Sequence, residues 1–131
     1  MKGLLIGVLL IACSTIKAQH TGQIDTVGKH TTSSNIYVKQ LGGDSLSGCF
    51  VIVIKQGVKL HKHLYHSETV TIIEGEGTMR LGEKSFKIKQ GDVIFIPRNT
   101  PHAATSTGNI PLKVISVQSP QFDGTDRVFL E

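Results

Sequence analysis

Residues 61–68 of this 131-residue chain read HKHLYHSE and hold three of its six histidines. Side chains at positions i and i+2 of a β-strand point to the same side, so on a strand His61 and His63 would project together and Lys62 would project the other way. Neutral imidazole nitrogens suit zinc, copper, iron and nickel. The cluster therefore indicates either half of a metal site or a solvated loop whose histidines respond to pH.

The elements that must position these histidines are short β-type runs separated by glycines. The runs are IYVKQL, CFVIVIK, ETVTIIE, GTMRLG, SFKIK, DVIFIP and LKVISV. Several short strands with turn signals every 8 to 12 residues or so are typical of a β-sandwich or barrel. After the first 18 residues no segment shows a convincing helical repeat.

The apolar patterns of these runs predict which strand faces are covered. VIVI (Val51–Ile54) and VIFI (Val93–Ile96) are apolar at every position, so we expect both faces of these two strands to be buried between sheets. In SFKIK, Phe86 and Ile88 alternate with polar residues, as on a strand with one face in water. Strands of this number can close a small barrel whose interior holds side chains or one small ligand.

Residues 57–75 carry the first of two motifs by which this sequence resembles the cupins, which are small jelly-roll barrels. In the family a glycine is followed after a short gap by His-x-His, then by a glutamate and later by a second glycine. The corresponding residues here are Gly57, His61, His63, Glu68 and Gly75. Every one of these residue types stands at a spacing that the family permits.

The second motif of the family is present with two departures. Gly91, Pro97 and His102 match it, whereas Asn99 stands in place of a glycine and Ser106 in place of an asparagine. Asparagine also tolerates the left-handed backbone conformation that glycine would supply. The position of Ser106 is not a metal ligand in the family, so neither departure affects the expected metal site.

The resemblance covers roughly residues 34–118 and implies an all-β fold, a single cupin jelly-roll barrel or double-stranded β-helix. Carried over position by position, the metal ligands of the family become His61, His63, Glu68 and His102. Structural zinc sites more often use cysteine thiolates in a closed shell, whereas this set would leave positions open for water or substrate. The implied cofactor is one divalent transition metal. Fe, Mn, Ni, Zn and Cu all stay open because the same ligands accept several ions.

Other polar residues near the motif have two interpretations each. We expect His66 to be a loop residue or a hydrogen-bond partner of the glutamate rather than a fifth ligand. Tyr65 would either offer its hydroxyl to a substrate or pack on a strand. Lys59 and Lys62 would attract an anionic substrate or simply lie exposed, and Arg80 would either bind a carboxylate in the cavity or face solvent.

The N-terminal segment has the layout of a secretory signal peptide. Gly3–Ala12 is an apolar run of ten residues after a positive start, too short to span a bilayer, which takes about 20 residues. Cleavage after Ala18 would leave Gln19 first. LIAC also resembles a lipobox, in which Cys13 is lipidated and becomes the first residue. Both alternatives predict export to the periplasm or the medium, with no membrane-spanning segment.

The remaining chain divides into a polar leader (residues 19–33), the barrel (34–118) and a C-terminal tail (119–131), as one domain. Removing residues 1–18 lowers the formal net charge from +4 to +2 and leaves no basic run, which argues against a nucleic-acid partner. In the soluble form Cys49 would be the one remaining cysteine, and in its apolar run it behaves as a small hydrophobe.

These features predict an exported metal-binding cupin, and we favour a metal-dependent enzyme that acts on a small molecule. The resemblance implies dioxygenases, sugar isomerases, epimerases and lyases, in which the ion acts as a Lewis acid or binds oxygen. A non-catalytic module that binds a saccharide or an organic acid stays open, as does a metal-binding accessory protein. No catalytic acid or base outside the ligand set is identifiable, and the fold alone does not fix the function. A homodimer is expected by resemblance only.

Overall fold

The computed structural model describes residues 23–130, so the expected signal segment and its cleavage points lie outside the described residues. One sheet contains the strands β1 (Ile36–Gly43), β2 (Gly48–Ile54), β4 (Ser67–Glu74), β7 (Val93–Ile96) and β9 (Leu112–Ser119). The other contains the strands β3 (Gly57–His63), β5 (Glu76–Leu81), β6 (Lys84–Lys89), β8 (His102–Ser106) and β10 (Arg127–Phe129). A single-turn 3₁₀ helix, η1 (Ile24–Thr26), precedes them.

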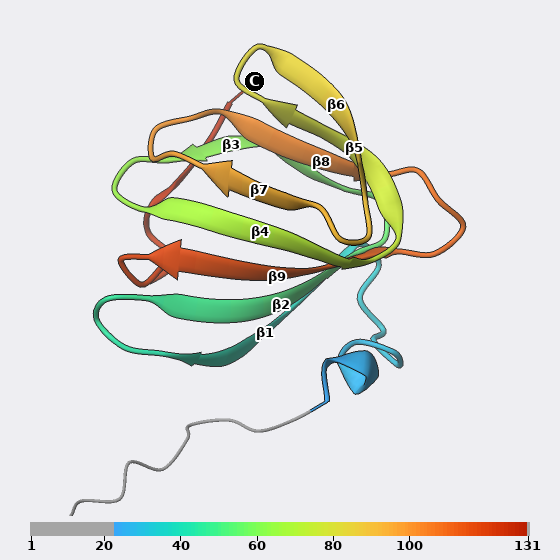
Figure 1. The fold of residues 1–131 in the computed structure, drawn as a ribbon. Coiled ribbons are helices and arrows are strands. Elements are labelled where there is room, and N and C mark those ends of the chain that lie inside the picture. The colour runs from blue at the N-terminus through green and yellow to red at the C-terminus, as the bar shows by residue number, and fades with distance from the viewer. Residues whose placement is uncertain (1–22, 131) are drawn as a thin grey trace, which may run out of the picture.

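The two sheets lie face to face and enclose a barrel (Figure 1). The first sheet has the strand order β1-β2-β9-β4-β7 and the second has the order β10-β3-β8-β5-β6. All neighbouring strands are antiparallel, and consecutive strands repeatedly cross from one sheet to the other. This is a double-stranded β-helix, and it confirms the predicted all-β jelly roll. Within residues 23–130 no helix is long and apolar enough to cross a membrane.

Aliphatic side chains from both sheets form the core between them. Its buried members are Ile54, Ile72, Met79, Ile88, Ile94, Ile96, Leu112 and Val114. Fully burying a side chain of this size contributes roughly 1.5–3 kcal/mol relative to leaving it exposed. The alternating apolar positions of the sequence therefore supply the main force that holds the sheets together.

The prediction that both faces of VIFI are covered is wrong for β7. Ile94 and Ile96 point into the core, but Val93 and Phe95 are 65% and 61% exposed. The reason is that the outer face of the first sheet is open at β7, as it is at Val117 of the central strand β9, which is 38% exposed. Sequence alone does not distinguish an open outer face from a covered one. The prediction for β6, an edge strand of the second sheet, is half correct. Ile88 is buried as expected, whereas Phe86 is 37% exposed.

The same prediction is correct for most of VIVI in β2, which is a central strand. Val51 and Val53 are buried on its outer face, and Val53 lies so close to Gly28 that a side chain at that glycine would overlap it. The leader therefore packs against β2. Lys55 fixes it further by donating from Nζ to the carbonyl oxygens of Thr31 and Ser33, at 3.3 and 2.7 Å.

The barrel extends beyond the expected boundary at residue 118. Strand β10 pairs antiparallel with β3 and becomes an edge strand of the second sheet. Its register places Arg127 opposite His63 and Phe129 opposite His61. Residues that were expected to form a tail thus lie beside the histidine motif.

Candidate metal centre

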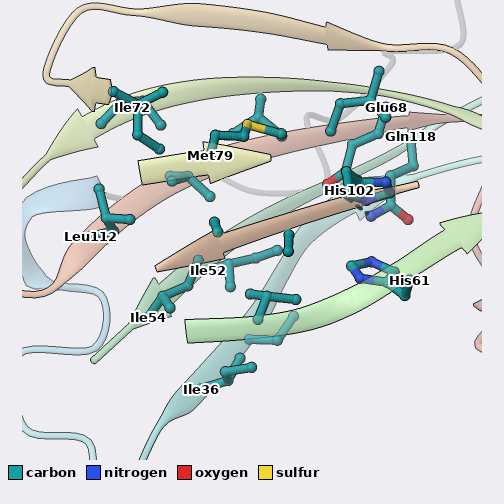
Figure 2. Close-up of a pocket in the computed structure, with 18 of the residues that line it drawn as sticks. Ile36, Ile52, Ile54, His61, Glu68, Ile72, Met79, His102, Leu112 and Gln118 are labelled. Atoms are coloured by element: carbon teal, nitrogen blue, oxygen red, sulfur yellow. Dashed lines mark hydrogen bonds and ion pairs between the residues drawn. The ribbon is translucent and has the colours of Figure 1, made fainter. Parts of the chain in front are cut away.

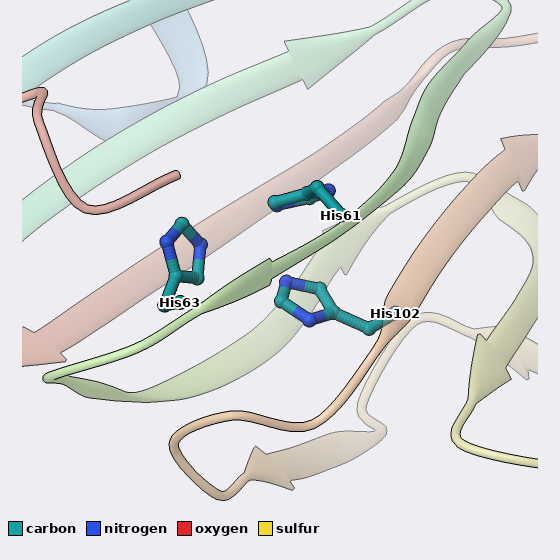
Figure 3. Close-up of side chains that lie close together, drawn as sticks. All are labelled: His61, His63 and His102. Atoms are coloured by element: carbon teal, nitrogen blue, oxygen red, sulfur yellow. The ribbon is translucent and has the colours of Figure 1, made fainter. Parts of the chain in front are cut away.

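The fold brings the four predicted site residues together from three strands. His61 and His63 end β3, Glu68 lies near the start of β4, and His102 begins β8. His61 and His102 are directly paired across β3 and β8, and paired residues of antiparallel strands project to the same face. The inward face of the second sheet therefore carries all three imidazoles, as Figure 3 shows.

The three imidazoles lie close enough to share one ion. One nitrogen from each of His61, His63 and His102 lies within 4.8 Å of the other two. The ring centroids are 4.2 Å apart for His61 and His102, 5.0 Å for His61 and His63, and 5.3 Å for His63 and His102. His61, His63, Glu68 and His102 are each at least 90% buried.

The same atom of each imidazole is held by the backbone. Nδ1 of His61, His63 and His102 lies 2.8, 3.0 and 2.9 Å from the carbonyl oxygens of Lys59, Asp126 and Thr100. A carbonyl oxygen only accepts, so each Nδ1 carries the proton and each Nε2 carries a lone pair. This arrangement fixes the ring and the tautomer that a metal ligand requires.

Two of these Nε2 atoms provide the test of whether a metal fits. Nε2 of His63 and Nε2 of His102 are buried and have no hydrogen-bond partner in the described part of the chain. Buried polar atoms are nearly always paired, so an unpaired one needs an explanation. A divalent cation among the three rings would satisfy both atoms, and the donor set of imidazoles plus a carboxylate suits it.

Glu68 supplies the negative charge of the group. Its Oε2 lies 3.8 Å from Nε2 of His63 and 3.5 Å from Nε2 of His102. Its Oε1 accepts hydrogen bonds from the Ser116 hydroxyl at 2.5 Å and from the Gln118 amide at 3.5 Å. Ser116 and Gln118 are two residues apart on the adjacent strand β9, so both side chains reach the same carboxylate.

The protonation states match those of ligands. Burial, together with the neighbouring imidazoles, lowers the pKa of His61 and that of His63 from 6.5 to about 4. Burial alone would raise the pKa of Glu68, but the close approach of His102, the hydrogen bond from Ser116 and the neighbouring His63 lower it to about 2. At neutral pH both histidines are neutral and the carboxylate is ionised, as metal binding requires.

The asparagine in the second motif joins the two halves of the site. Asn99 has a positive φ of 61°, which confirms that it takes the left-handed conformation expected at that position. Its backbone N–H donates to the carbonyl oxygen of His63 at 2.5 Å. The loop before His102 is thereby fixed to the end of β3.

His66 and Asp126 form a second group that the sequence analysis did not foresee. His66 is 2% exposed, and its Nδ1 lies 2.8 Å from Oδ2 of Asp126 instead of contacting Glu68. The Asp126 carboxylate also accepts the backbone N–H groups of Leu64, Tyr65 and His66, at 2.7, 2.9 and 3.1 Å. Asp126 therefore holds the turn between the two ligand-bearing strands β3 and β4.

The signal for Asp126 in the sequence was weak. It is the second acid of DGTD in the segment that was expected to be a tail, 60 residues from His66. A lone aspartate in a polar segment gives no indication of its partner. Its role follows only from the pairing of β10 with β3.

The remaining candidates lie away from the imidazoles. Tyr65 is 73% exposed on the turn, and Lys59 is exposed as well. Lys62 points to the outer side of β3, opposite the two histidines. Arg80 is exposed, and its Nε donates to the carbonyl oxygen of Gly82, which confirms the solvent-facing alternative.

Three of the four site residues, His61, Glu68 and His102, stand at one end of an elongated cavity inside the barrel. Figure 2 shows His61, His102, Glu68 and Gln118 grouped at that end and the aliphatic side chains extending away from them. The rest of the lining is almost entirely apolar and includes Ile52, Ile72, Met79 and Leu112. The site thus combines a compact polar end with a long apolar wall.

Residues 50–118, more than half of the chain, match the sequence profile of the Cupin domain. The chain belongs to the cupin family. The match includes both motifs and all four site residues of this cupin. It also explains why the two motifs meet, since in a jelly roll β3 and β8 are neighbours although they are far apart in the sequence.

Relatives of this cupin carry different names. An uncharacterized protein of Methanocaldococcus jannaschii is 37% identical over 81 residues, which cover 62% of this chain and 65% of that protein. Mannose-1-phosphate guanylyltransferase of Salmonella typhimurium is 32% identical over 79 residues, which cover 59% of this chain and 16% of that protein. Quercetin 2,3-dioxygenase of Bacillus subtilis is 30% identical over 107 residues, which cover 70% of this chain and 32% of that protein. The chain spans less than two thirds of each of these relatives.

Solved structures share the fold at lower identity. A conserved protein of Klebsiella pneumoniae with a double-stranded β-helix domain superimposes with a TM-score of 0.71 at 20% identity, covering 85% of this chain and 96% of that one. This likeness concerns the fold alone.

Proposed function

We propose that this cupin is an exported metal-dependent enzyme that acts on a small, largely apolar molecule, with oxygenase chemistry on a phenolic or enediol group. The observation that carries the proposal is the combination at one end of the cavity. Three buried imidazoles present Nε2 lone pairs beside an ionised carboxylate, and an aliphatic wall continues from them. Packing alone does not require this polar group, since apolar residues would fill the barrel without unpaired atoms.

The residues that would hold the metal are His61, His63, Glu68 and His102. When bound, the ion would supply a Lewis acid and, if it is redox-active, a centre for oxygen chemistry. Four protein ligands leave coordination positions for a substrate donor on a five- or six-coordinate ion. The backbone carbonyls that hold each Nδ1 keep the rings in place, and Ser116 orients the carboxylate.

The apolar wall favours an aromatic or aliphatic substrate over a sugar. A polyhydroxylated ligand along this wall would bury hydroxyl groups without partners, at a cost of roughly 1–3 kcal/mol for each. A ring with two adjacent oxygens would place these at the polar end and its apolar body against partly buried side chains such as Ile52 and Val58. The dioxygenase relative is consistent with this class of substrate.

The proposal is tested by metal content and turnover together. Untagged protein is analysed for bound metal, loaded in turn with iron, manganese, nickel, copper and zinc, and screened with flavonols, catechols, unsaturated uronates and hexose phosphates while oxygen uptake and product mass are followed. We expect oxygen-dependent turnover of a phenolic substrate, lost in His61→Ala/His63→Ala and retained in His30→Ala, which changes an exposed histidine of the leader. Saturable binding without turnover would contradict the enzyme proposal and favour a ligand-binding module. Turnover of uronates alone would contradict the oxygenase proposal and favour a lyase.

The proposal of export rests on residues 1–18. The intact mass of the protein made in a native-like host separates the alternatives. A chain that begins at Gln19 supports a soluble exported form, and a diacylated Cys13 supports a lipoprotein. A chain that retains Met1 contradicts export by either route.

A further inference from the structure

Strand β10 places two side chains at the polar end of the cavity. Arg127 is paired with His63 and Phe129 with His61, and directly paired residues of antiparallel strands project to the same face. Arg127 and Phe129 therefore lie on the same side of the second sheet as the histidines, but on its edge strand, where both are exposed and Phe129 is 61% exposed. Arg127 lines the same cavity as His61 and Glu68, and the ring of Phe129 lies 6.0 Å from that of His61.

The positive charge of Arg127 has no acidic partner within residues 23–130. Its guanidinium carbon lies 5.2 Å from the ring centroid of Phe122, in a cation–π contact, and it forms no ion pair with a described carboxylate. The adjacent Asp126 is fully engaged by His66 and three backbone amides. Arg127 therefore carries an uncompensated charge at the mouth of the site.

The electrostatic influence of this charge reaches the imidazoles. Burial is the main cause of the lowered pKa of His61, and Arg127 adds to that effect. A divalent ion beside Glu68 would leave one net positive charge; Arg127 adds one and the nearby Asp126 carboxylate subtracts one, so one net positive charge remains. An anionic group on the bound molecule would balance this charge.

We propose that Arg127 is a specificity-determining residue that binds a carboxylate of the substrate while the substrate's oxygen donors occupy the metal end of the site. This inference rests on the proposed function and narrows its substrate class to a phenolic or enediol molecule that also bears a carboxylate. The planar guanidinium matches a carboxylate with two parallel hydrogen bonds. The contact of its guanidinium carbon with the Phe122 ring, 5.2 Å from the ring centroid, limits where it can lie.

The other cations near the motif do not serve this purpose. Lys62 is paired with Val128 on the outer side of the second sheet, and Arg80 is exposed and bound to Gly82. Among the described residues, Arg127 is the one cation that lines the cavity. Lys62 is therefore a matched control, since its loss removes an equal charge from the opposite side of β3.

The test compares ligands of similar size that differ in charge. The protein is loaded with zinc, which excludes redox turnover, and calorimetry measures its affinity for 3,4-dihydroxybenzoate, 3-(3,4-dihydroxyphenyl)propanoate and 4-methylcatechol. We expect at least one of the two carboxylates to bind about tenfold more tightly than 4-methylcatechol, as one charge-assisted contact at a partly exposed site would produce. Arg127→Gln should remove this preference and leave the affinity for 4-methylcatechol within about twofold. Arg127→Lys should keep part of the preference, and Lys62→Gln should keep all of it.

The result that overturns the inference is the absence of a preference that depends on Arg127. This would be seen if Arg127→Gln weakens charged and neutral ligands equally, if Lys62→Gln has the same effect, or if zinc-loaded protein binds none of the three ligands. Zinc stoichiometry measured on the same samples separates this failure from that of the proposed function. A wild-type chain that takes up no metal refutes both, whereas a metal-loaded chain without the preference refutes only the role of Arg127.

Discussion

His63 and His66 are neighbours with different surroundings. Their ring centroids are 4.0 Å apart, and both side chains are buried. Nδ1 of His63 meets a neutral backbone carbonyl and its Nε2 faces Glu68, whereas Nδ1 of His66 meets the charged carboxylate of Asp126. His63 is thereby directed into the candidate metal centre, and His66 is tied to the turn beside it. Nε2 of His66 is also buried without a partner in the described part of the chain, so the two histidines differ in their neighbours: His63 groups with His61 and His102, and His66 with His63 and Asp126.

The largest expected difference between the two histidines is in metal affinity. His61→Ala/His63→Ala removes two of three converging Nε2 atoms and should lower the affinity at least about 100-fold, to the point where the purified protein holds no metal. His66→Ala removes only a neighbour of a ligand and should cost about tenfold. Competition with a chelator measures both. If His66→Ala lowered the metal affinity as much as the double variant does, His66 would itself be a ligand, and the proposed difference between His63 and His66 would be wrong.

The second-largest effect is expected at Asp126, whose carboxylate contacts His66. Asp126→Asn keeps the size of the side chain but weakens its bonds to the backbone N–H groups of the turn and to His66. We expect a loss of about 1–3 kcal/mol in the free energy of unfolding, measured by urea denaturation of the metal-free protein. Asp123→Asn is the matched control, because Asp123 is exposed and bonds only to Thr125. Equal losses in both variants would show that Asp126 has no special role.

The pH dependence of stability follows from the buried histidines. In the folded metal-free chain His61 and His63 take up protons only near pH 4, whereas in the unfolded chain they do so near 6.5. Between these values the unfolded state binds more protons, so the free energy of unfolding falls as the pH falls from about 6.5 to 4. Below pH 4.5 Glu68, with its pKa of about 2, adds to the loss.

Thermal melts of the metal-free protein at pH 7, 5.5 and 4.5 measure this dependence. We expect Tm to be at least about 5 °C lower at pH 4.5 than at pH 7, which corresponds to about 1 kcal/mol for a domain of this size. His30→Gln should leave the difference unchanged, because His30 is exposed in the leader. A Tm that stays constant over this range would mean that the imidazoles are not held neutral by burial.

The smallest effect is expected at the turn residue between the two histidines. Tyr65→Ala removes a side chain that is 73% exposed but keeps the backbone N–H that Asp126 accepts. Metal affinity should stay within about twofold, and the free energy of unfolding within roughly 0.5 kcal/mol, as for other surface substitutions. A larger change in affinity would mean that the turn itself, rather than His66 and Asp126, supports His63.

The sequence predicted the parts of the site that depend on local patterns. Strand alternation placed His61 and His63 on one face, and the two motifs identified Glu68 and His102 as their companions. It did not predict which outer faces stay open, so the exposure of Phe95 was missed. It also did not predict that β10 returns to β3, because a three-residue strand after a polar segment has no distinctive pattern. Asp126 and Arg127 were therefore absent from the expected site.

The position of Asp126 also makes the site depend on a segment remote in the sequence. β10 is the last of the described strands to be synthesised, and until it pairs with β3 the imidazole of His63 lacks its Nδ1 acceptor and the turn to β4 lacks its anchor. The buried core residues all lie on other strands, whereas these two contacts depend on the segment that leads into β10. We therefore expect metal uptake to require β10 in place, whereas burial of the apolar core does not.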